Sequence, residues 1–313
     1  MLITQRASGI IYKFVKTFHN GTYLLPANVC PIVPLTLHNA GVSFEFVDID
    51  NLTLCIDEQK CLELFSLNPK KYQGIIFVRT YGYIYDTTDF FQKLRDVNEK
   101  FKIIDDRCLV IPDVDIKVEN CDLILYSTGY AKPINVGFGG IGLLNENIII
   151  DNYNESGPSD LDIEHFYKAA LENNRILDSI PLGWLDTRFY KGNIHDYLET
   201  IEKEKNRAFK HKEILNNMYK DLLPKDILMF DEFQNWRFNI LVDNKELLLE
   251  KIFENKLFAS SHYKPTNVIF NNNRHLEAEK LYHKVINLFN DSYFTLEQAG
   301  AVCKIINRYL KSK

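Results

Sequence analysis

Residues 126–142 read YSTGYAKPINVGFGGIG, and the interpretation of the whole chain depends on this stretch. It follows the apolar run 123–125, which predicts a buried strand. Ser127 comes first, Lys132 follows, and a glycine cluster begins at Gly137. Burial of a lysine lowers the pKa of its amine, and the neutral amine can attack a carbonyl, as a lysine that holds pyridoxal phosphate must do. A surface lysine beside a glycine-rich turn is the alternative, and this stretch alone leaves both open.

The glycines of the same stretch could alternatively form a nucleotide-binding loop. Such a loop lies between a strand and a helix, whose N-terminus faces the phosphates. Here the sequence GFGGIG is followed by the apolar runs 141–144 and 148–150, with Asn-Glu-Asn between them. This pattern is typical of two strands joined by a turn. The sequence therefore does not favour a dinucleotide site.

The composition indicates an ordinary globular protein. The chain has 313 residues, of which 46% are hydrophobic and 25% charged, and its formal net charge is -5. This charge argues against a broad nucleic-acid surface, and no apolar run is long enough to cross a membrane. The start, MLITQRASG, lacks the features of a signal peptide, and the six cysteines contain no CxxC pair. We therefore expect a cytoplasmic protein with reduced thiols and no metal site.

The first half of the chain alternates between predicted strands and predicted helices. This alternation is typical of an α/β fold with a mostly parallel, doubly wound sheet, in which ligands bind beyond the carboxyl ends of the strands. Pro26, the Tyr81-Gly82 turn, Asp106 and residues 127–132 fall at those ends. Strands are expected at 22–26, 42–47, 74–78, 101–104 and 122–126, and helices at 8–18, 57–64, 89–100 and before Gly41.

The pattern changes after about residue 157. A long periodic segment, 195–223, predicts a connecting helix, and the residues after it predict a smaller α+β domain. We therefore expect a large domain of residues 1–194 and a small domain of residues 195–313. The other predicted elements are helices at 160–180, 245–255, 277–288 and 295–310 and a strand at 236–242.

Three features of the large domain predict one cofactor site. Asp106 ends a buried strand, and an ionised carboxylate there would keep a pyridine nitrogen protonated. Ser127 and the glycine backbone offer donors to a phosphate, as do Ala7 and Ser8 at the start of a helix. Lys132 would supply the amine and a proton shuttle. Each of these residues also has an ordinary structural alternative: Asp106 could cap a helix, and Ser8 could be a plain N-cap serine.

The sequence resembles the DegT/StrS group, the sugar aminotransferases of pyridoxal-phosphate fold type I. Their lysine segment has the form Ser-Phe-x-x-x-Lys-x-x-x-x-Gly-x-Gly-Gly, which Ser127, Lys132 and the glycines at 137, 139 and 140 match. Asp106 in IIDDRC stands where the family has its pyridine-nitrogen aspartate. The other similar segments are VRTYG at 78–82, AGVSFEFVDID at 40–50, HYKP at 262–265, EAEKLYHKVINLF at 277–289 and FTLEQA at 294–299.

The resemblance implies a fold and an activity. It implies a large cofactor-binding domain, a small C-terminal domain and a homodimer with its sites at the interface. It also implies pyridoxal 5'-phosphate as cofactor and transfer of an amino group from glutamate to a nucleotide-linked keto sugar, in amino-sugar or surface-polysaccharide biosynthesis. Lys132 and Asp106 would be catalytic, while Lys132, Asp106, Ser127, Ala7 and Ser8 would bind the cofactor.

Four further residues are candidates for substrate binding. Arg237 or Arg188 could hold a donor carboxylate through two parallel hydrogen bonds, although a surface salt bridge is an alternative for each. Tyr263 and His262 are expected to face the site by analogy with the family.

The chain also departs from the family pattern. It begins close to the phosphate-binding motif and has Arg6-Ala7-Ser8 in place of Gly-Thr-Ala, and residues 28–30 lack the aromatic side chain that stacks on the cofactor. Leu109 replaces a glutamine, and Pro133 follows the lysine. Two alternative functions stay open: a non-catalytic paralogue that acts as a dimeric partner, and a pyridoxal-phosphate-dependent sugar dehydratase. Lys132 argues against the dehydratases in which histidine replaces the lysine.

Overall fold

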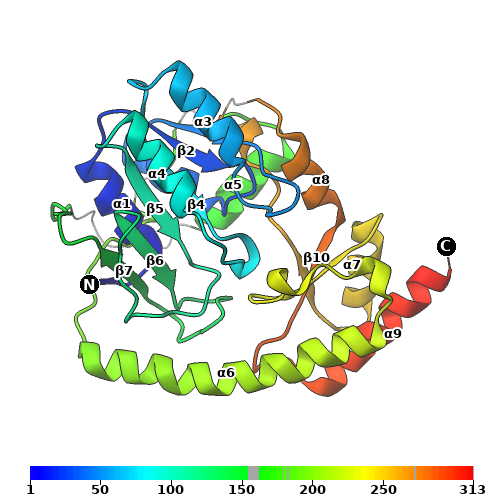
Figure 1. Ribbon diagram of the computed structural model, residues 1–313. Helices are drawn as coiled ribbons and strands as arrows, with labels where there is room; N and C mark the ends of the chain where they lie inside the picture. Colours follow the sequence, from blue (N-terminus) through cyan, green and yellow to red (C-terminus); the bar gives the residue numbers. More distant parts are fainter. Residues whose placement is uncertain (154–161, 178, 182, 271–272, 313) are drawn as a thin grey trace.

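The structure is a computed structural model that describes residues 1–153, 162–177, 179–181, 183–270 and 273–312. Its strands form a seven-stranded sheet and a three-stranded sheet. Helix α6 (Ile194–Leu222) runs along both parts of the molecule, from the end of the large sheet near the N-terminus to the helices near the C-terminus (Figure 1). Asn193 caps this helix by accepting a hydrogen bond from the His195 backbone N–H.

The seven-stranded sheet has the order β1-β7-β6-β5-β4-β2-β3. Strands β2 to β6 are parallel to one another, and β7 is antiparallel to both β6 and β1. The predicted α/β class with a mostly parallel, doubly wound sheet is confirmed, although β1 was not expected. The strands are β1 (Leu2–Thr4), β2 (Thr22–Pro26), β3 (Phe44–Val47), β4 (Tyr72–Val78), β5 (Lys102–Asp106), β6 (Leu123–Ser127) and β7 (Gly140–Leu144).

Helices cover both faces of this sheet. On one face lie α1 (Ala7–Thr17) and α2 (Ile32–Asn39), whose apolar side chains share a core with those of the strands. On the other lie α3 (Glu58–Leu67) and α4 (Thr88–Val97), which contribute to a second core. The apolar stripe of α4 is the reason that this charged helix packs on the sheet, because it places Phe90, Phe91 and Leu94 in that core.

The smaller sheet is antiparallel with the order β8-β10-β9 and has its own core. A capping box of Thr295 and Gln298 begins the last helix. Asp48 accepts hydrogen bonds from the backbone N–H groups of Glu277 and Ala278, so a large-sheet loop holds the start of α8. The elements are α5 (Ile163–Glu172), β8 (Phe238–Leu241), α7 (Lys245–Glu254), β9 (Ala259–Ser261), α8 (Leu276–Lys284), β10 (Val285–Leu288) and α9 (Leu296–Lys311).

Three sequence-based expectations for these elements are wrong. The helix predicted over 277–288 ends at Lys284, and the remainder is β10, the central strand of the small sheet. The four residues of β10 are all buried, the polar Asn287 included, so this strand is enclosed on both sides. Residues 148–150, predicted as a strand, have no regular structure. The predicted helix 160–180 is too long, because α5 covers only Ile163–Glu172 and the described residues after it are not helical; residues 160, 161 and 178 lie outside the described part of the chain.

Within the described residues, no helix is long and apolar enough to cross a membrane. The three-stranded sheet and the carboxyl half of α6 share one core, whereas the seven-stranded sheet lies between two others. The division of the chain at residues 194 and 195 stays a prediction.

Candidate active site

The predicted site residues lie beyond one edge of the seven-stranded sheet. Strands β2, β4, β5 and β6 run in the same direction, so their carboxyl ends meet at that edge. Asp106 is the last residue of β5, and Ser127 is the last residue of β6. The turn that carries Lys132 follows directly. The topology therefore brings Asp106, Ser127 and Lys132 to the same edge.

Asp106 is a buried carboxylate whose charge is only partly compensated. Its side chain is 4% exposed, and Oδ1 accepts a hydrogen bond of 2.9 Å from the Cys108 backbone N–H. Burial raises the pKa of Asp106, while that hydrogen bond and the positive charge of Lys132 act in the opposite direction. A cationic N–H donor would complete the compensation. The protonated pyridine nitrogen of pyridoxal phosphate is such a donor, so Asp106 fits this cofactor.

Lys132 lies in the turn between β6 and β7 and is half-buried, less enclosed than the sequence predicted. Ala131 before it adopts the left-handed region, with φ of 58°. The base of the turn is fixed by Thr128, whose backbone N–H donates to Gly139 and whose carbonyl accepts from Val136. The carbonyl of Ala131 accepts a hydrogen bond of 2.6 Å from the Trp236 indole N–H. A residue of the small-sheet region therefore contacts the lysine turn.

The N-terminus of α1 adjoins the end of β6. A Cβ added to Gly140 would lie 2.4 Å from Ala7 Cα, so only glycine allows this close approach. Ser127 Oγ lies 3.4 Å from the Gly139 carbonyl oxygen and 3.4 Å from the Gly129 backbone nitrogen. Helix α1 has no side-chain hydrogen bond from its N-cap, Arg6. This arrangement of a helix N-terminus, a hydroxyl and glycine backbone suits a phosphate.

The side chain of Arg6 points over the same region. A Cβ added to Gly129 would lie 3.6 Å from Arg6 Nη1, and the guanidinium lies 5.8 Å from the centroid of the Tyr130 ring. The structure thus places Ala7 and Ser8 at the start of a helix next to Ser127, as the sequence predicted. It adds a cation that the family motif lacks.

His262 and Asn28 form a buried polar pair at the end of β2. The Asn28 carbonyl can only accept, so the contact of 2.7 Å from His262 Nε2 places the proton on Nε2. Burial lowers the pKa of His262 to about 4, and the imidazole is neutral. In the described structure, His262 Nδ1 and Asn28 Oδ1 are buried without a hydrogen-bond partner. Unpaired buried atoms of this kind are typical of a site that receives a polar ligand.

Tyr263 follows His262 in the chain and contacts Cys30. The Cys30 thiol and burial raise the pKa of the Tyr263 hydroxyl. Burial also raises the pKa of Cys108, on which Asp106, Lys132 and Cys30 all act electrostatically. Cys108 therefore interacts electrostatically both with Cys30 and with Asp106 and Lys132. Cys30 occupies the region where the family has an aromatic side chain.

A cavity of ≈ 680 Å³ lies between α5 and the segment that includes β9. Its lining is rich in aromatic side chains and contains both His262 and Tyr263. Glu164, Lys168 and Lys264 add charged groups of both signs. Aromatic faces with polar groups around them are suited to an organic ligand.

The two arginines expected to bind a carboxylate have protein partners. Arg237 is buried, forms an ion pair with Asp291, and its guanidinium lies 4.1 Å from the centroid of the Phe289 ring. Arg188 is exposed and donates to Asp186 with Nε and Nη2, at 2.9 and 2.7 Å. The structure does not bring either guanidinium into contact with the Asp106–Lys132 pair; Arg188 fits the surface salt-bridge alternative, whereas the ion pair of Arg237 is buried.

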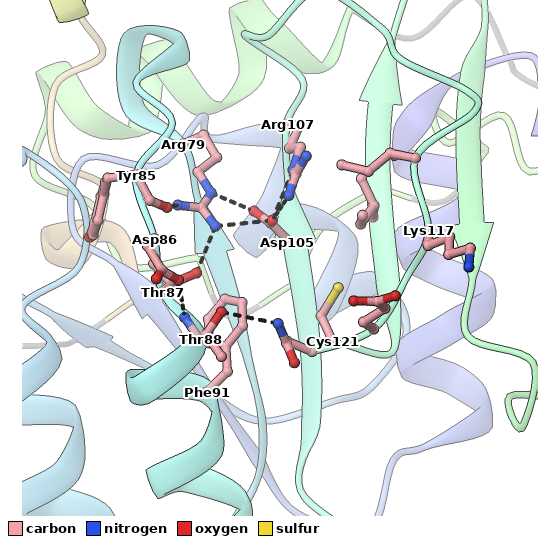
Figure 2. A pocket seen from close by; sticks show the side chains of 14 residues that line it. Arg79, Tyr85, Asp86, Thr87, Thr88, Phe91, Asp105, Arg107, Lys117 and Cys121 are labelled. Atoms are coloured by element: carbon pink, nitrogen blue, oxygen red, sulfur yellow. Dashed lines mark hydrogen bonds and ion pairs between the residues drawn. The ribbon is translucent and has the colours of Figure 1, made fainter.

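Asp105 points to the opposite face of the sheet from Asp106, because neighbouring side chains in a strand alternate. There Asp105 lies between Arg79 and Arg107, as Figure 2 shows. Arg79 donates to both carboxylate oxygens, at 2.8 and 3.1 Å, and also to Thr87 and the Tyr85 carbonyl. The cluster lines a cavity of ≈ 320 Å³ beside α4.

The role of Trp236 was missed by the sequence analysis. The residue stands just before a strand, and no periodicity or motif distinguishes it there. Its contact with Ala131 joins positions that lie far apart in the sequence, so only the fold reveals it. The Cys30–Tyr263 contact was missed for the same reason.

No family model matches the sequence, and no curated protein matches it. Solved structures do match. An aminotransferase of the DegT/DnrJ/EryC1/StrS group from Brucella abortus has a TM-score of 0.69 at 15% identity over 98% of this chain and 85% of its own. PseC of Helicobacter pylori, an aminotransferase in pseudoaminic acid biosynthesis, has a TM-score of 0.69 at 16% identity over 99% and 86%.

A third similar structure carries a cofactor. NtdA of Bacillus subtilis, solved with bound PMP, has a TM-score of 0.68 at 19% identity over 99% of this chain and 73% of its own. At such low identity the likeness concerns the fold. The chain has the fold of the DegT/StrS-type, pyridoxal-phosphate-dependent sugar aminotransferases.

Proposed function

We propose that this protein is a pyridoxal-phosphate-dependent aminotransferase that moves an amino group from glutamate to a nucleotide-linked keto sugar. The single observation that carries the proposal is Asp106, a buried and only partly compensated carboxylate near Lys132 at the carboxyl edge of the large sheet. The fold is that of aminotransferases, which supports the reaction class. The donor, the sugar and the biosynthetic pathway come from the sequence resemblance.

Pyridoxal phosphate, when bound, supplies an electron sink for the negative charge that develops when a proton leaves the substrate carbon. Asp106 would hold its ring nitrogen in the protonated form. Ser127, the backbone at Ala7 and Ser8 and the Arg6 guanidinium would hold its phosphate. Lys132 would hold the aldehyde carbon through Nζ.

Lys132 has a second role in this proposal. When the donor amine takes its place on the aldehyde carbon, Lys132 Nζ would move a proton between the substrate carbon and the cofactor. Over a full turnover the amine and α-hydrogen of glutamate would be exchanged for the keto oxygen of the sugar, so glutamate would be released as 2-oxoglutarate and the keto carbon would carry the amine, with no net consumption of water or of an oxidant.

The cavity of ≈ 680 Å³ is the proposed entrance for the acceptor sugar. Tyr263 and other aromatic side chains could stack on sugar carbons, and the unpaired His262 Nδ1 can accept a hydrogen bond from a hydroxyl group. Arg188 and Arg237 have no place in this assignment because each has a carboxylate partner.

We also propose a homodimer, as the resemblance implies. Arg6 and Arg188 lie beside the start of α1, and both side chains are exposed. A second subunit could therefore contact the phosphate end of the site. Light scattering after gel filtration measures the assembly, and a purely monomeric protein would contradict this part.

An amino-transfer assay tests the main proposal. The protein with added pyridoxal phosphate should convert glutamate to 2-oxoglutarate in a half-reaction, and then aminate one member of a panel of nucleotide-linked keto sugars. Lys132→Ala should abolish both steps, whereas Lys191→Ala, which changes an exposed lysine, should leave them intact. Cofactor binding without any half-reaction would favour a non-catalytic dimeric partner instead.

A further inference from the structure

The turn that carries Lys132 has few hydrogen bonds at its tip. Residues 130–133 lie outside any helix or strand, and Ala131 adopts a backbone conformation that disfavours alanine. Such a conformation persists only where the surroundings hold it. In the described part of the chain, these four residues make one hydrogen bond, from the Trp236 indole N–H to the Ala131 carbonyl.

Trp236 is itself held on three sides. Its backbone N–H donates to the Tyr81 carbonyl at 3.3 Å, and its ring stacks on the Tyr81 ring with an interplanar angle of 10°. Its carbonyl accepts a hydrogen bond of 2.9 Å from Lys212 Nζ of α6. The residue is 8% exposed. The indole N–H therefore has a fixed position, from which it holds the Ala131 carbonyl in the turn.

We propose that Trp236 is a positioning residue for Lys132. By holding the carbonyl of the preceding residue, its indole N–H sets the direction in which the Lys132 side chain leaves the turn. The inference rests on the proposed function, because it concerns the reaction of Lys132 with an aldehyde. Misplacing a reacting group by about 1 Å can cost about 10²-fold in rate, so one backbone hydrogen bond beside the lysine can matter.

The test removes the indole N–H and keeps the ring. Trp236→Phe retains an aromatic face toward Tyr81 but cannot donate to Ala131. Trp184→Phe is the matched control, because the Trp184 indole N–H is buried without a hydrogen-bond partner among the described residues. Each protein is mixed with pyridoxal phosphate and reduced with borohydride at timed intervals, and mass spectrometry measures the fraction modified at Lys132.

We expect Trp236→Phe to form the Lys132 adduct at least about tenfold more slowly than wild type, and Trp184→Phe to match wild type. The pH dependence of the cofactor absorption band should shift in Trp236→Phe alone, which a merely structural role would not cause. Adduct formation at the wild-type rate with an unchanged pH dependence would overturn the inference.

A second variant covers the case in which Trp236→Phe does not fold. The chain has two tryptophans, so a Trp184→Phe protein grown with benzothienylalanine carries sulfur in place of the indole N–H at position 236 alone. This change preserves ring shape, and the same slow adduct formation is expected. If wild-type protein forms no Lys132 adduct at all, the proposed function fails. If wild type reacts and the sulfur analogue reacts equally fast, only the positioning role fails.

Discussion

The neighbouring carboxylates Asp105 and Asp106 should respond in opposite ways to the same substitution. Asp105 is 1% exposed and has two guanidinium partners, of which Arg79 is 2% exposed. Removing one partner of a buried ion pair costs about 3–5 kcal/mol, because the remaining charge stays buried. An asparagine oxygen can keep one of these hydrogen bonds, so we expect Asp105→Asn to lower the free energy of unfolding by about 3 kcal/mol, near the low end of that range.

Asp106→Asn should have little effect on stability, or a stabilising one. Burial raises the pKa of Asp106, so in the window between its unfolded and folded pKa values the folded chain binds more protons than the unfolded chain. Stability from this group therefore falls as pH rises through that window, and at neutral pH the buried charge is a cost. Asparagine removes the charge and keeps the hydrogen bond from the Cys108 backbone.

Urea unfolding of both variants, without cofactor and at neutral pH, measures these free energies. Activity provides the second readout. Asp106→Asn should lose about 10²–10³-fold in turnover, because the charge that supports the pyridine nitrogen is gone, whereas folded Asp105→Asn should keep most of its activity. The reasoning is refuted if Asp106→Asn is destabilised as strongly as Asp105→Asn, since Asp106 would then be a structural acid.

Three further predictions follow from single contacts. Burial lowers the pKa of Lys212 from 10.5 to about 7. Between these two pH values the folded chain therefore holds fewer protons than the unfolded chain, and the free energy of unfolding should rise with pH. The urea midpoint should rise less steeply with pH for Lys212→Met than for wild type. Gly140→Ala should weaken pyridoxal phosphate binding, measured by fluorescence titration, because its Cβ would lie 2.4 Å from Ala7 Cα; unchanged affinity would count against the phosphate site. His262 should show no titration by NMR between about pH 5 and 8, because burial lowers its pKa to about 4; a midpoint within that range would contradict the neutral Nε2–H form.

The sequence predicted the large sheet well because its strands and helices follow simple patterns. Strand β2 matches its predicted bounds, and β5 and β6 end with the acid and the serine that the motifs singled out. Residues at the carboxyl ends of parallel strands converge by topology. For this reason Asp106, Ser127 and Lys132 could be brought together without any knowledge of side-chain positions.

The other features depend on contacts between distant segments, which a sequence pattern does not encode. Arg237 has an ordinary place in a strand-like run, and only the folded chain shows its Asp291 partner. The same holds for the Trp236 contact with the lysine turn. Strand β10 was mistaken for the end of a helix because a short, mostly apolar segment fits either structure.

The most direct test of the central claim is to locate the covalent attachment of pyridoxal phosphate on the wild-type chain. After borohydride reduction and proteolysis, mass spectrometry should find the cofactor adduct on the peptide that contains Lys132 and at no more than trace levels on other lysines. Adducts spread over surface lysines, or no adduct at Lys132, would contradict the account.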